Sequence, residues 1–213
     1  MMPGESDPLR LAALISARMT HDLSGAIGTL AAAVEMASEE ATEPSEALSL
    51  AVEAAEEVRG RLRLLRAAWG PTSSEPLDLA TLRTLTDGLV GSGSLTVALD
   101  GLPDNTMFAG GTARVVLNLL LLAREALPAG GEVTLAGTTT DLVISVAGPR
   151  AAWPQGLARC LVSEANAWGA ACDPRTLQMP LTALLARSLG LRLSLLLPAG
   201  VGDAIPMLRL SES

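Results

Sequence analysis

Two long stretches of the first seventy residues favour helix, and they constrain the fold of this 213-residue chain more than any other feature. No proline follows Pro8 until Pro44, and Ala and Leu dominate from Asp7 to about Ser38. The acidic segment 38–46, SEEATEPSE, is predicted to be a turn, and a second helix is expected from about Ser45 to Trp69. Two long helices joined by a short turn form an antiparallel hairpin. Because such a hairpin cannot bury its apolar faces alone, the sequence predicts a dimeric four-helix bundle.

The segment 70–76, GPTSSEP, is the clearest linker, and it is expected to separate domains 1–70 and 71–213. Beyond it, helical patterns alternate with short strand patterns. The expected helices cover 78–90, 110–127, 157–168 and 176–188, and the expected strands cover 94–100, 128–137, 141–149, 191–197 and 204–210. Helices gathered on one face of a mixed sheet form an α/β sandwich. The predicted fold class is therefore α + α/β.

The composition excludes several function classes. A formal charge of −8 and a pI near 4.7 argue against a nucleic-acid surface, and no nucleic-acid partner is expected. The start of the chain lacks a signal-peptide pattern, and its longest apolar runs are about half the roughly 20 residues of a membrane span, which predicts a cytoplasmic protein without a membrane partner. Cys160 and Cys172 are too few for a zinc site and are predicted to be buried free thiols. No metal site is expected.

The segment 17–28, ARMTHDLSGAIG, contains the only histidine of the chain, His21. In helical projection it lies nearly opposite an apolar stripe. The stripe consists of Ile15, Met19, Leu23, Ala26, Ile27, Leu30, Val34 and Ala37. Gly25 and Gly28 share the face of His21 and clear space around the imidazole, although each costs a helix about 1 kcal/mol relative to Ala. This pattern predicts a docking surface around a reactive histidine; a surface histidine beside two helix-packing glycines is the alternative.

Two charged neighbours extend the candidate site. The Asp22 carboxylate can accept the Nδ1–H of His21, fix the tautomer and leave Nε2 as the nucleophile. Arg18 can steady a negatively charged phosphoryl group or its donor. The alternatives are an acid that only solvates the helix surface and an ordinary surface arginine.

A helical hairpin with an exposed His-Asp pair, followed by a small α/β sandwich, resembles the dimerisation and ATP-binding domains of bacterial histidine kinases. The segment LAALISARMTHDLSGAIGTLAAAVEM resembles more closely the ChpT family of alphaproteobacterial histidine phosphotransferases. The matching residues are Arg18, His21, Asp22, Leu23 and Gly28. The family often has Ser-Pro where this chain has Gly25-Ala26, which puts the local helix geometry in doubt. The resemblance implies a histidine-kinase ATPase-like sandwich in the second domain.

The second domain departs from the kinase pattern at three places. In LNLLLLAREALP, Asn118 matches the first Asn of the kinase motif, but Leu122 replaces the second, which holds Mg²⁺. In ISVAGPR, Ala147 stands where kinases carry the Asp that contacts adenine. The segment 179–190, MPLTALLARSLG, offers no glycine-rich phosphate loop. Losing all three removes the groups that position ATP, so autophosphorylation is not expected.

The sequence and the resemblance together predict a homodimeric phosphotransfer protein with a covalent phosphohistidine intermediate at His21. The resemblance implies a phosphorelay in the cell cycle, with a hybrid kinase of the CckA type as donor and response regulators of the CtrA and CpdR type as acceptors. No cofactor of its own is expected, since Mg²⁺ comes from the receiver domain. Two alternatives stay open: a non-catalytic dimeric adaptor with an incidental histidine, and an active kinase with an unusual ATP site.

Overall fold

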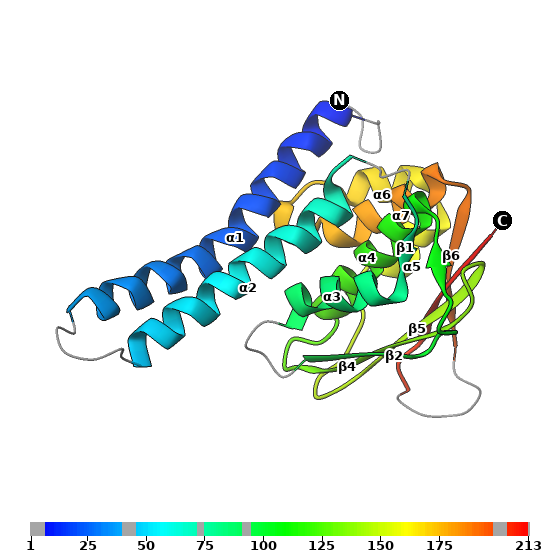
Figure 1. The fold of residues 1–213 in the computed structure, drawn as a ribbon. Helices are drawn as coiled ribbons and strands as arrows, with labels where there is room; N and C mark the ends of the chain where they lie inside the picture. Colours follow the sequence, from blue (N-terminus) through cyan, green and yellow to red (C-terminus); the bar gives the residue numbers. More distant parts are fainter. Residues whose placement is uncertain (1–6, 40–45, 72–74, 91–94, 198–203, 213) are drawn as a thin grey trace.

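The computed structural model describes residues 7–39, 46–71, 75–90, 95–197 and 204–212. It begins with the predicted hairpin of two long helices, α1 (Pro8–Glu39) and α2 (Glu46–Trp69). Helix α1 ends at Glu39, two residues into the predicted turn 38–46, and residues 40–45 lie outside the described residues. The end of the hairpin formed by the C-terminal part of α1 and the N-terminal part of α2 projects away from the rest of the chain (Figure 1).

The five predicted strands form one mixed sheet in the order β2-β4-β5-β7-β6. Their bounds are β2 Leu95–Gly101, β4 Gly131–Gly137, β5 Asp141–Ala147, β6 Leu191–Leu196 and β7 Met207–Glu212. Strands β2 and β4 pair in parallel, and the other three pairings are antiparallel. A small antiparallel pair, β1 (Leu77–Asp78) with β3 (Met107–Phe108), was not anticipated, because two-residue strands carry no readable alternation.

The remaining helices are α3 (Leu79–Val90), α4 (Gly110–Glu125), α5 (Leu157–Val162), α6 (Glu164–Ala170), a 3₁₀ turn η1 (Pro174–Thr176) and α7 (Gln178–Ser188). They gather on one face of the sheet, which confirms the predicted sandwich (Figure 1). The predicted cap of α3 is present, since Asp78 Oδ1 accepts from the Thr81 N–H at 2.7 Å.

The single helix predicted over 157–168 is wrong, because Ser163 divides it. The backbone of Ser163 is extended (φ −147°, ψ 153°), which ends α5. Its side chain then accepts a hydrogen bond from the Asn166 N–H and caps α6. Ser163 therefore starts a new helix at a position where the periodicity predicts the interior of a single helix.

Helix α4 forms the centre of the core. Its apolar residues are buried around almost its whole circumference, because it lies between the sheet and the helices α2 and α7. The buried set on this helix comprises Ala113, Val115, Val116, Leu117, Leu119, Leu120, Leu122 and Ala123. A helix that is apolar all round has to be covered on every side. Helix α2 covers part of this surface. The last residue of α4, Glu125, in turn contacts Arg18 of α1.

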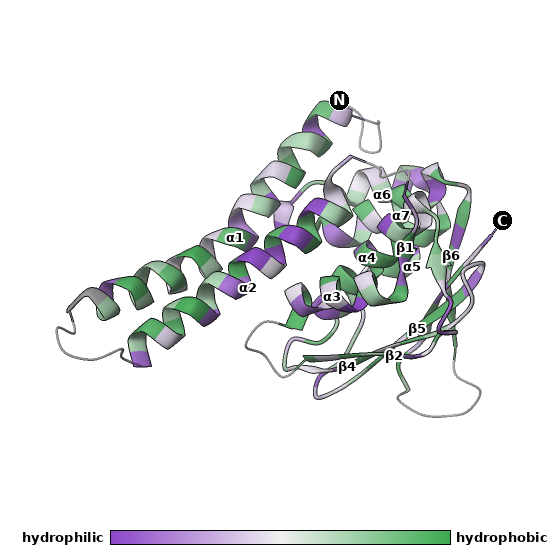
Figure 2. Cartoon of the chain, viewed as in Figure 1, coloured by the Kyte–Doolittle hydropathy of each residue, from purple (hydrophilic) through white to green (hydrophobic). Residues whose placement is uncertain are grey.

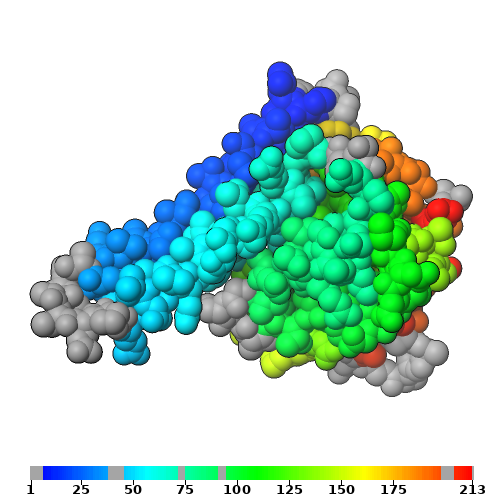
Figure 3. All heavy atoms as spheres, viewed as in Figure 1, coloured from blue at the N-terminus to red at the C-terminus, as the bar shows by residue number. Residues whose placement is uncertain are grey.

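The hairpin packs on the second part of the chain through α2, which contacts α3 and α4 (Figure 3). Within the predicted apolar stripe of α1, Ala26 is buried, but Met19, Ile27 and Val34 are 38%, 50% and 51% exposed. The physical reason is that, among the described elements, α1 has its main contacts with α2 and η1. The proposed boundary at residue 70 stays a prediction. Among the described helices, none has the length and apolarity needed to cross a membrane.

Candidate functional site

His21 lies in the middle of α1 with its side chain 68% exposed. A Cβ added to either Gly25 or Gly28 would meet no heavy atom within 4 Å. The helix surface at these two positions, one and two turns beyond the histidine, is therefore open and carries no side chain. The exposed ring and the bare helix surface beside it are compatible with the predicted docking surface.

Asp22 lies against the ring as the sequence predicts. Its Oδ1 is 3.3 Å from His21 Nδ1, and its Oδ2 accepts from Arg18 Nε at 2.7 Å. The backbone beside the histidine is also held, because Arg61 Nη1 of α2 donates to the Asp22 carbonyl oxygen at 3.1 Å. The contact is present, while its chemical role stays a prediction.

The guanidinium of Arg18 is hydrogen-bonded within the protein. Besides Asp22, its guanidinium donates to Glu125 Oε1 at 2.7 Å and to the carbonyl oxygens of Pro174 and Arg175 at 3.2 and 2.9 Å. Four protein acceptors thus surround a group with five N–H donors. The predicted phosphoryl contact of Arg18 is untested, and the structure adds a second role, which joins α1 to α4 and η1.

Burial shapes the charges of this cluster. Burial by itself would lower the pKa of Arg18, but the hydrogen bond to Asp22 and the charges of Glu125 and Asp22 raise it above its usual value. Burial raises the pKa of Glu125, against the opposing effect of Arg18. Burial, and after it the positive charge of Arg61, lowers the pKa of Arg124. Arg124 is therefore a partly desolvated cation whose positive neighbours disfavour its charge.

A cavity of about 500 Å³ opens beside the histidine. It is lined by Arg18, His21, Asp22, Arg124, Glu125, Pro128, Pro154 and Arg175. No hydrogen bond or ion pair joins Arg124 to a described residue, which leaves its donors available. Sequence reasoning missed Arg124, Glu125 and Arg175. The adjacent charged pair at the end of the mostly apolar α4 was a signal for Arg124 and Glu125, whereas no local pattern pointed to Arg175.

The residues at the positions of the kinase ATP-site motif have structural contacts in this protein. Asn118 is fully buried, donates to the carbonyl oxygens of Ala68 and Arg114, and accepts from Trp69 Nε1 and Gln178 Nε2. Its side chain has no capacity left for a Mg²⁺ ion.

Leu122, at the position of the second kinase Asn, is only 1% exposed and belongs to the core. No carboxylate replaces it, so neither of these two motif positions offers a metal ligand. Within the described ranges, no group of three or more His, Cys, Asp or Glu residues could hold a metal ion.

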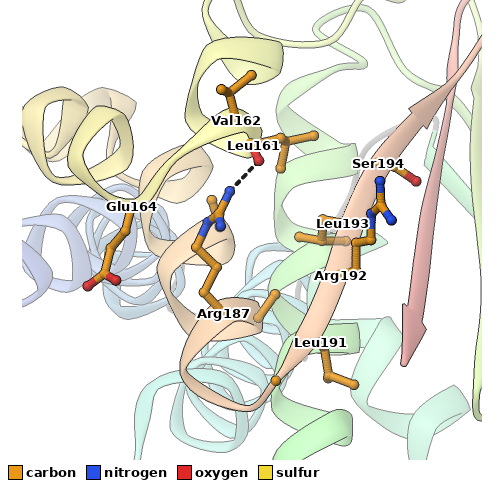
Figure 4. Close-up of a pocket in the computed structure, with 11 residues that line it drawn as sticks. Leu161, Val162, Glu164, Arg187, Leu191, Arg192, Leu193 and Ser194 are labelled. Atoms are coloured by element: carbon orange, nitrogen blue, oxygen red, sulfur yellow. Dashed lines mark hydrogen bonds between the residues drawn. The ribbon is translucent and has the colours of Figure 1, made fainter. Parts of the chain in front are cut away.

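A second cavity, of about 750 Å³, lies elsewhere, between α5, α7 and β6 (Figure 4). Arg187 lies across it and donates to the Leu161 carbonyl oxygen (Figure 4). Its lining includes no residue of α1 or α2. It is therefore separate from the histidine site. Of the two predicted buried thiols, Cys160 is buried but Cys172 is exposed, because it follows the end of α6 in a surface turn.

Comparison with known proteins gives the family. Residues 79–199, more than half of the chain, match the family described as "Histidine phosphotransferase C-terminal domain". No curated protein gives a significant match. Among solved structures, a bacterial phosphotransferase is similar over 99% of this chain and 100% of its own, with 24% identity and a TM-score of 0.74. At this identity the likeness shows a shared fold.

Two histidine kinases match less well. AdeS of Acinetobacter baumannii has 13% identity and a TM-score of 0.36, with 91% of this chain and 97% of that chain covered. A kinase of Burkholderia phymatum STM815 has 20% identity and a TM-score of 0.38, with 94% of both chains covered.

Proposed function

Because the chain belongs to the histidine phosphotransferase family, we propose that it relays a phosphoryl group between receiver domains through a phosphohistidine at His21. The observation that carries this proposal is the environment of that residue. The only histidine of the chain is 68% exposed, has a carboxylate at Nδ1 and faces an open surface beside a cavity.

The transfer is an exchange of one bond to phosphorus for another. Nε2 of His21 attacks the phosphorus of an aspartyl phosphate, the N–P bond forms, and the P–O bond to the receiver carboxylate breaks. The ring keeps its Nδ1 proton and becomes cationic, and Asp22 lies where it stabilises that charge. The carboxylate of a second receiver then attacks the same phosphorus, and His21 leaves as a neutral imidazole.

The cations of the cavity give this proposal an electrostatic basis. Arg124 and Arg175 line the same cavity as His21. Arg124 is partly desolvated and has no hydrogen-bond partner among the described residues, and such an arginine attracts an anion more strongly than a solvated one. We therefore assign the first protein contact with the phosphoryl group to Arg124, ahead of Arg18, whose donors are mostly occupied.

Autophosphorylation from ATP has no support at the kinase-motif positions. Asn118 is saturated and buried, and Leu122 fills the core. Phosphoryl transfer depends on positioning and on neutralising the charge of the phosphate groups. We propose that the receiver domain supplies the Mg²⁺ and that the protein needs no cofactor of its own.

A homodimer is part of the proposal. Apolar residues make up much of the projecting half of the hairpin (Figure 2), and large exposed apolar side chains lie on both helices beyond the first turn of α1. They are Met19, Ile27, Val34 and Met36 on α1 and Leu48, Leu50, Val52 and Leu62 on α2. A second copy of the hairpin would cover them in a four-helix bundle. Ile27→Glu should therefore produce a monomer in light scattering, while Ala32→Glu, a matched change on the face of His21, should leave the dimer intact.

The finer partner assignment rests on the resemblance alone. A hybrid kinase receiver of the CckA type is the proposed donor, and regulators of the CtrA and CpdR type are the proposed acceptors.

A labelling experiment tests the function. Purified protein receives labelled ATP alone, or a receiver domain carrying labelled phosphate, with His21→Ala alongside. Label only from the receiver and only on the wild type would support the relay. Label from ATP alone would mean an active kinase site. Binding of the receiver without labelling, unchanged by His21→Ala, would favour an adaptor.

A further inference from the structure

Four side chains form one continuous chain of contacts from the end of α4 to the imidazole of His21. Glu125 Oε1 accepts from Arg18 Nη2 at 2.7 Å, and Arg18 Nε donates to Asp22 Oδ2, also at 2.7 Å. The other carboxylate oxygen, Asp22 Oδ1, lies 3.3 Å from His21 Nδ1. Donors and acceptors thus alternate along these contacts. The two carboxylates accept, and the guanidinium and the imidazole N–H donate.

The middle of this chain is held in place by atoms that do not belong to it. Arg18 also donates to the carbonyl oxygens of Pro174 and Arg175, at 3.2 and 2.9 Å. Arg61 fixes the backbone of Asp22 through its carbonyl oxygen at 3.1 Å. A planar guanidinium that bonds acceptors in several directions has one orientation available. The carboxylate that it contacts is therefore oriented as well.

Three members of this chain of contacts are mostly buried, and only the imidazole is exposed. The side chains of Glu125, Arg18 and Asp22 are only 15–23% exposed, whereas that of His21 is 68% exposed. Partly buried charge pairs are screened less by solvent than exposed pairs. The three partly buried groups can therefore hold their geometry while the ring stays accessible to a partner.

We propose that Glu125 is a positioning residue, which acts through Arg18 and Asp22 to keep His21 in the Nδ1–H tautomer with Nε2 free. An i, i+1 pair on a helix diverges, so the Asp22 carboxylate needs an external hold to stay at the ring. Arg18 provides that hold, and Glu125 anchors Arg18 from another part of the fold. For its kinetic consequence the inference rests on the proposed function, because the tautomer matters to the rate only if Nε2 is the nucleophile.

A purely structural clamp between α1 and α4 would use the same contacts. The two roles differ in what they do to the imidazole. A clamp changes stability and leaves the ring protons where they are. A positioning chain changes which ring nitrogen carries the proton, since an imidazole without a partner favours the Nε2–H form.

The test is ¹⁵N NMR of the ring nitrogens in the whole, unphosphorylated chain. The single histidine makes the assignment direct, because both ring signals belong to His21. Spectra are recorded at alkaline pH, in the range where the two ring shifts no longer change with pH, so that they report the neutral tautomers. The wild type should show mainly the Nδ1–H form, and Glu125→Gln should shift the population toward Nε2–H. Glu132→Gln, the same change at an exposed position of β4, should leave the wild-type spectrum unchanged.

A double-mutant cycle keeps the test decisive if Glu125→Gln also lowers stability. In an Arg18→Gln background the connection is already broken, so adding Glu125→Gln should not change the tautomer further. A wild type that is mainly Nε2–H, or a Glu125→Gln spectrum equal to the wild type, would overturn the proposal. So would an equal shift from Glu132→Gln.

Kinetics supply the second readout. Glu125→Gln should slow phosphoryl uptake from a receiver by about tenfold, at the lower end of the cost of losing an outer partner of a histidine in metal sites. An unchanged rate would overturn the kinetic part. If the wild type takes up no phosphoryl group, the proposed function fails, but the tautomer comparison still decides whether Glu125 positions the ring.

Discussion

The backbone of Gly88 in α3 lies directly against that of Gly60 in α2. A Cβ on Gly88 would overlap the Gly60 carbonyl oxygen, whereas a Cβ on Gly60 would meet the Gly88 Cα at 3.4 Å, an ordinary contact. The two helices therefore cross with no side chain between them. Arg61, the next residue of α2, donates on its other side across the hairpin to the Asp22 carbonyl oxygen of α1.

The crossing predicts unequal effects of two alanine substitutions. Gly88→Ala should destabilise the protein by about 1–3 kcal/mol, the usual cost of overpacking. Gly60→Ala should be close to neutral, because a gain of up to about 1 kcal/mol in helix propensity offsets the tighter contact. Denaturant unfolding of both variants measures the difference. Equal losses at the two positions would contradict the geometry.

Gly25 should show opposite effects on stability and on activity. Gly25→Ala should stabilise the protein by about 1 kcal/mol, because the added Cβ points into open space and alanine favours helix. If a receiver docks on this face, the same methyl group should slow phosphoryl uptake. Gly169→Ala, in equally open space on α6, is the matched control and should leave uptake unchanged. Identical uptake in both variants would argue against docking over Gly25.

Asn118 should behave as a structural residue. Asn118→Ala leaves the partly buried Trp69 Nε1 donor without its acceptor, and an unsatisfied group of this kind costs about 1–3 kcal/mol. Gln178 Nε2 loses one acceptor but keeps the Asn118 backbone carbonyl oxygen and Thr182 Oγ1. A clear drop in the thermal midpoint is expected. Calorimetric titration should find no Mg²⁺-ATP binding to the wild type. Binding that disappears in Asn118→Ala would instead identify this residue as a metal ligand.

The cap of α3 predicts a pH dependence of stability. The hydrogen bonds from the Thr81 side chain and backbone lower the pKa of Asp78. The folded state therefore holds the carboxylate more strongly than the unfolded state, whose Asp pKa is about 3.9. The contribution is complete above that value and is lost as the pH falls through the lower pKa of the folded state.

Asp78→Asn is the variant that measures this contribution, because asparagine also caps helices but does not titrate. Thermal midpoints recorded between about pH 5 and about pH 2 should fall less steeply for the variant than for the wild type. Parallel profiles would show that the cap does not depend on the charge.

The sequence by itself determined the order and type of most elements. The periodicity of 46–69 and the alternation of 141–147 are local properties, and local spacing fixes which face of a helix or strand is apolar. The same reasoning placed His21 opposite the apolar stripe of α1, where the structure leaves it exposed. It also found the contact with Asp22, because the partner is the next residue.

Only the tertiary structure decided what surrounds that pair. Glu125 lies 107 residues from Arg18 in the chain, and the carbonyl of Arg175 lies 157 residues away. No spacing rule connects such positions; the packing of α2 on α3 and α4 brings them together. The sequence analysis missed the break at Ser163 for a related reason. A serine side chain can cap a new helix instead of continuing the old one, but it does so only where the fold places the following turn within its reach. Local chemistry selected His21 as the candidate residue, and long-range packing built the charged environment around it.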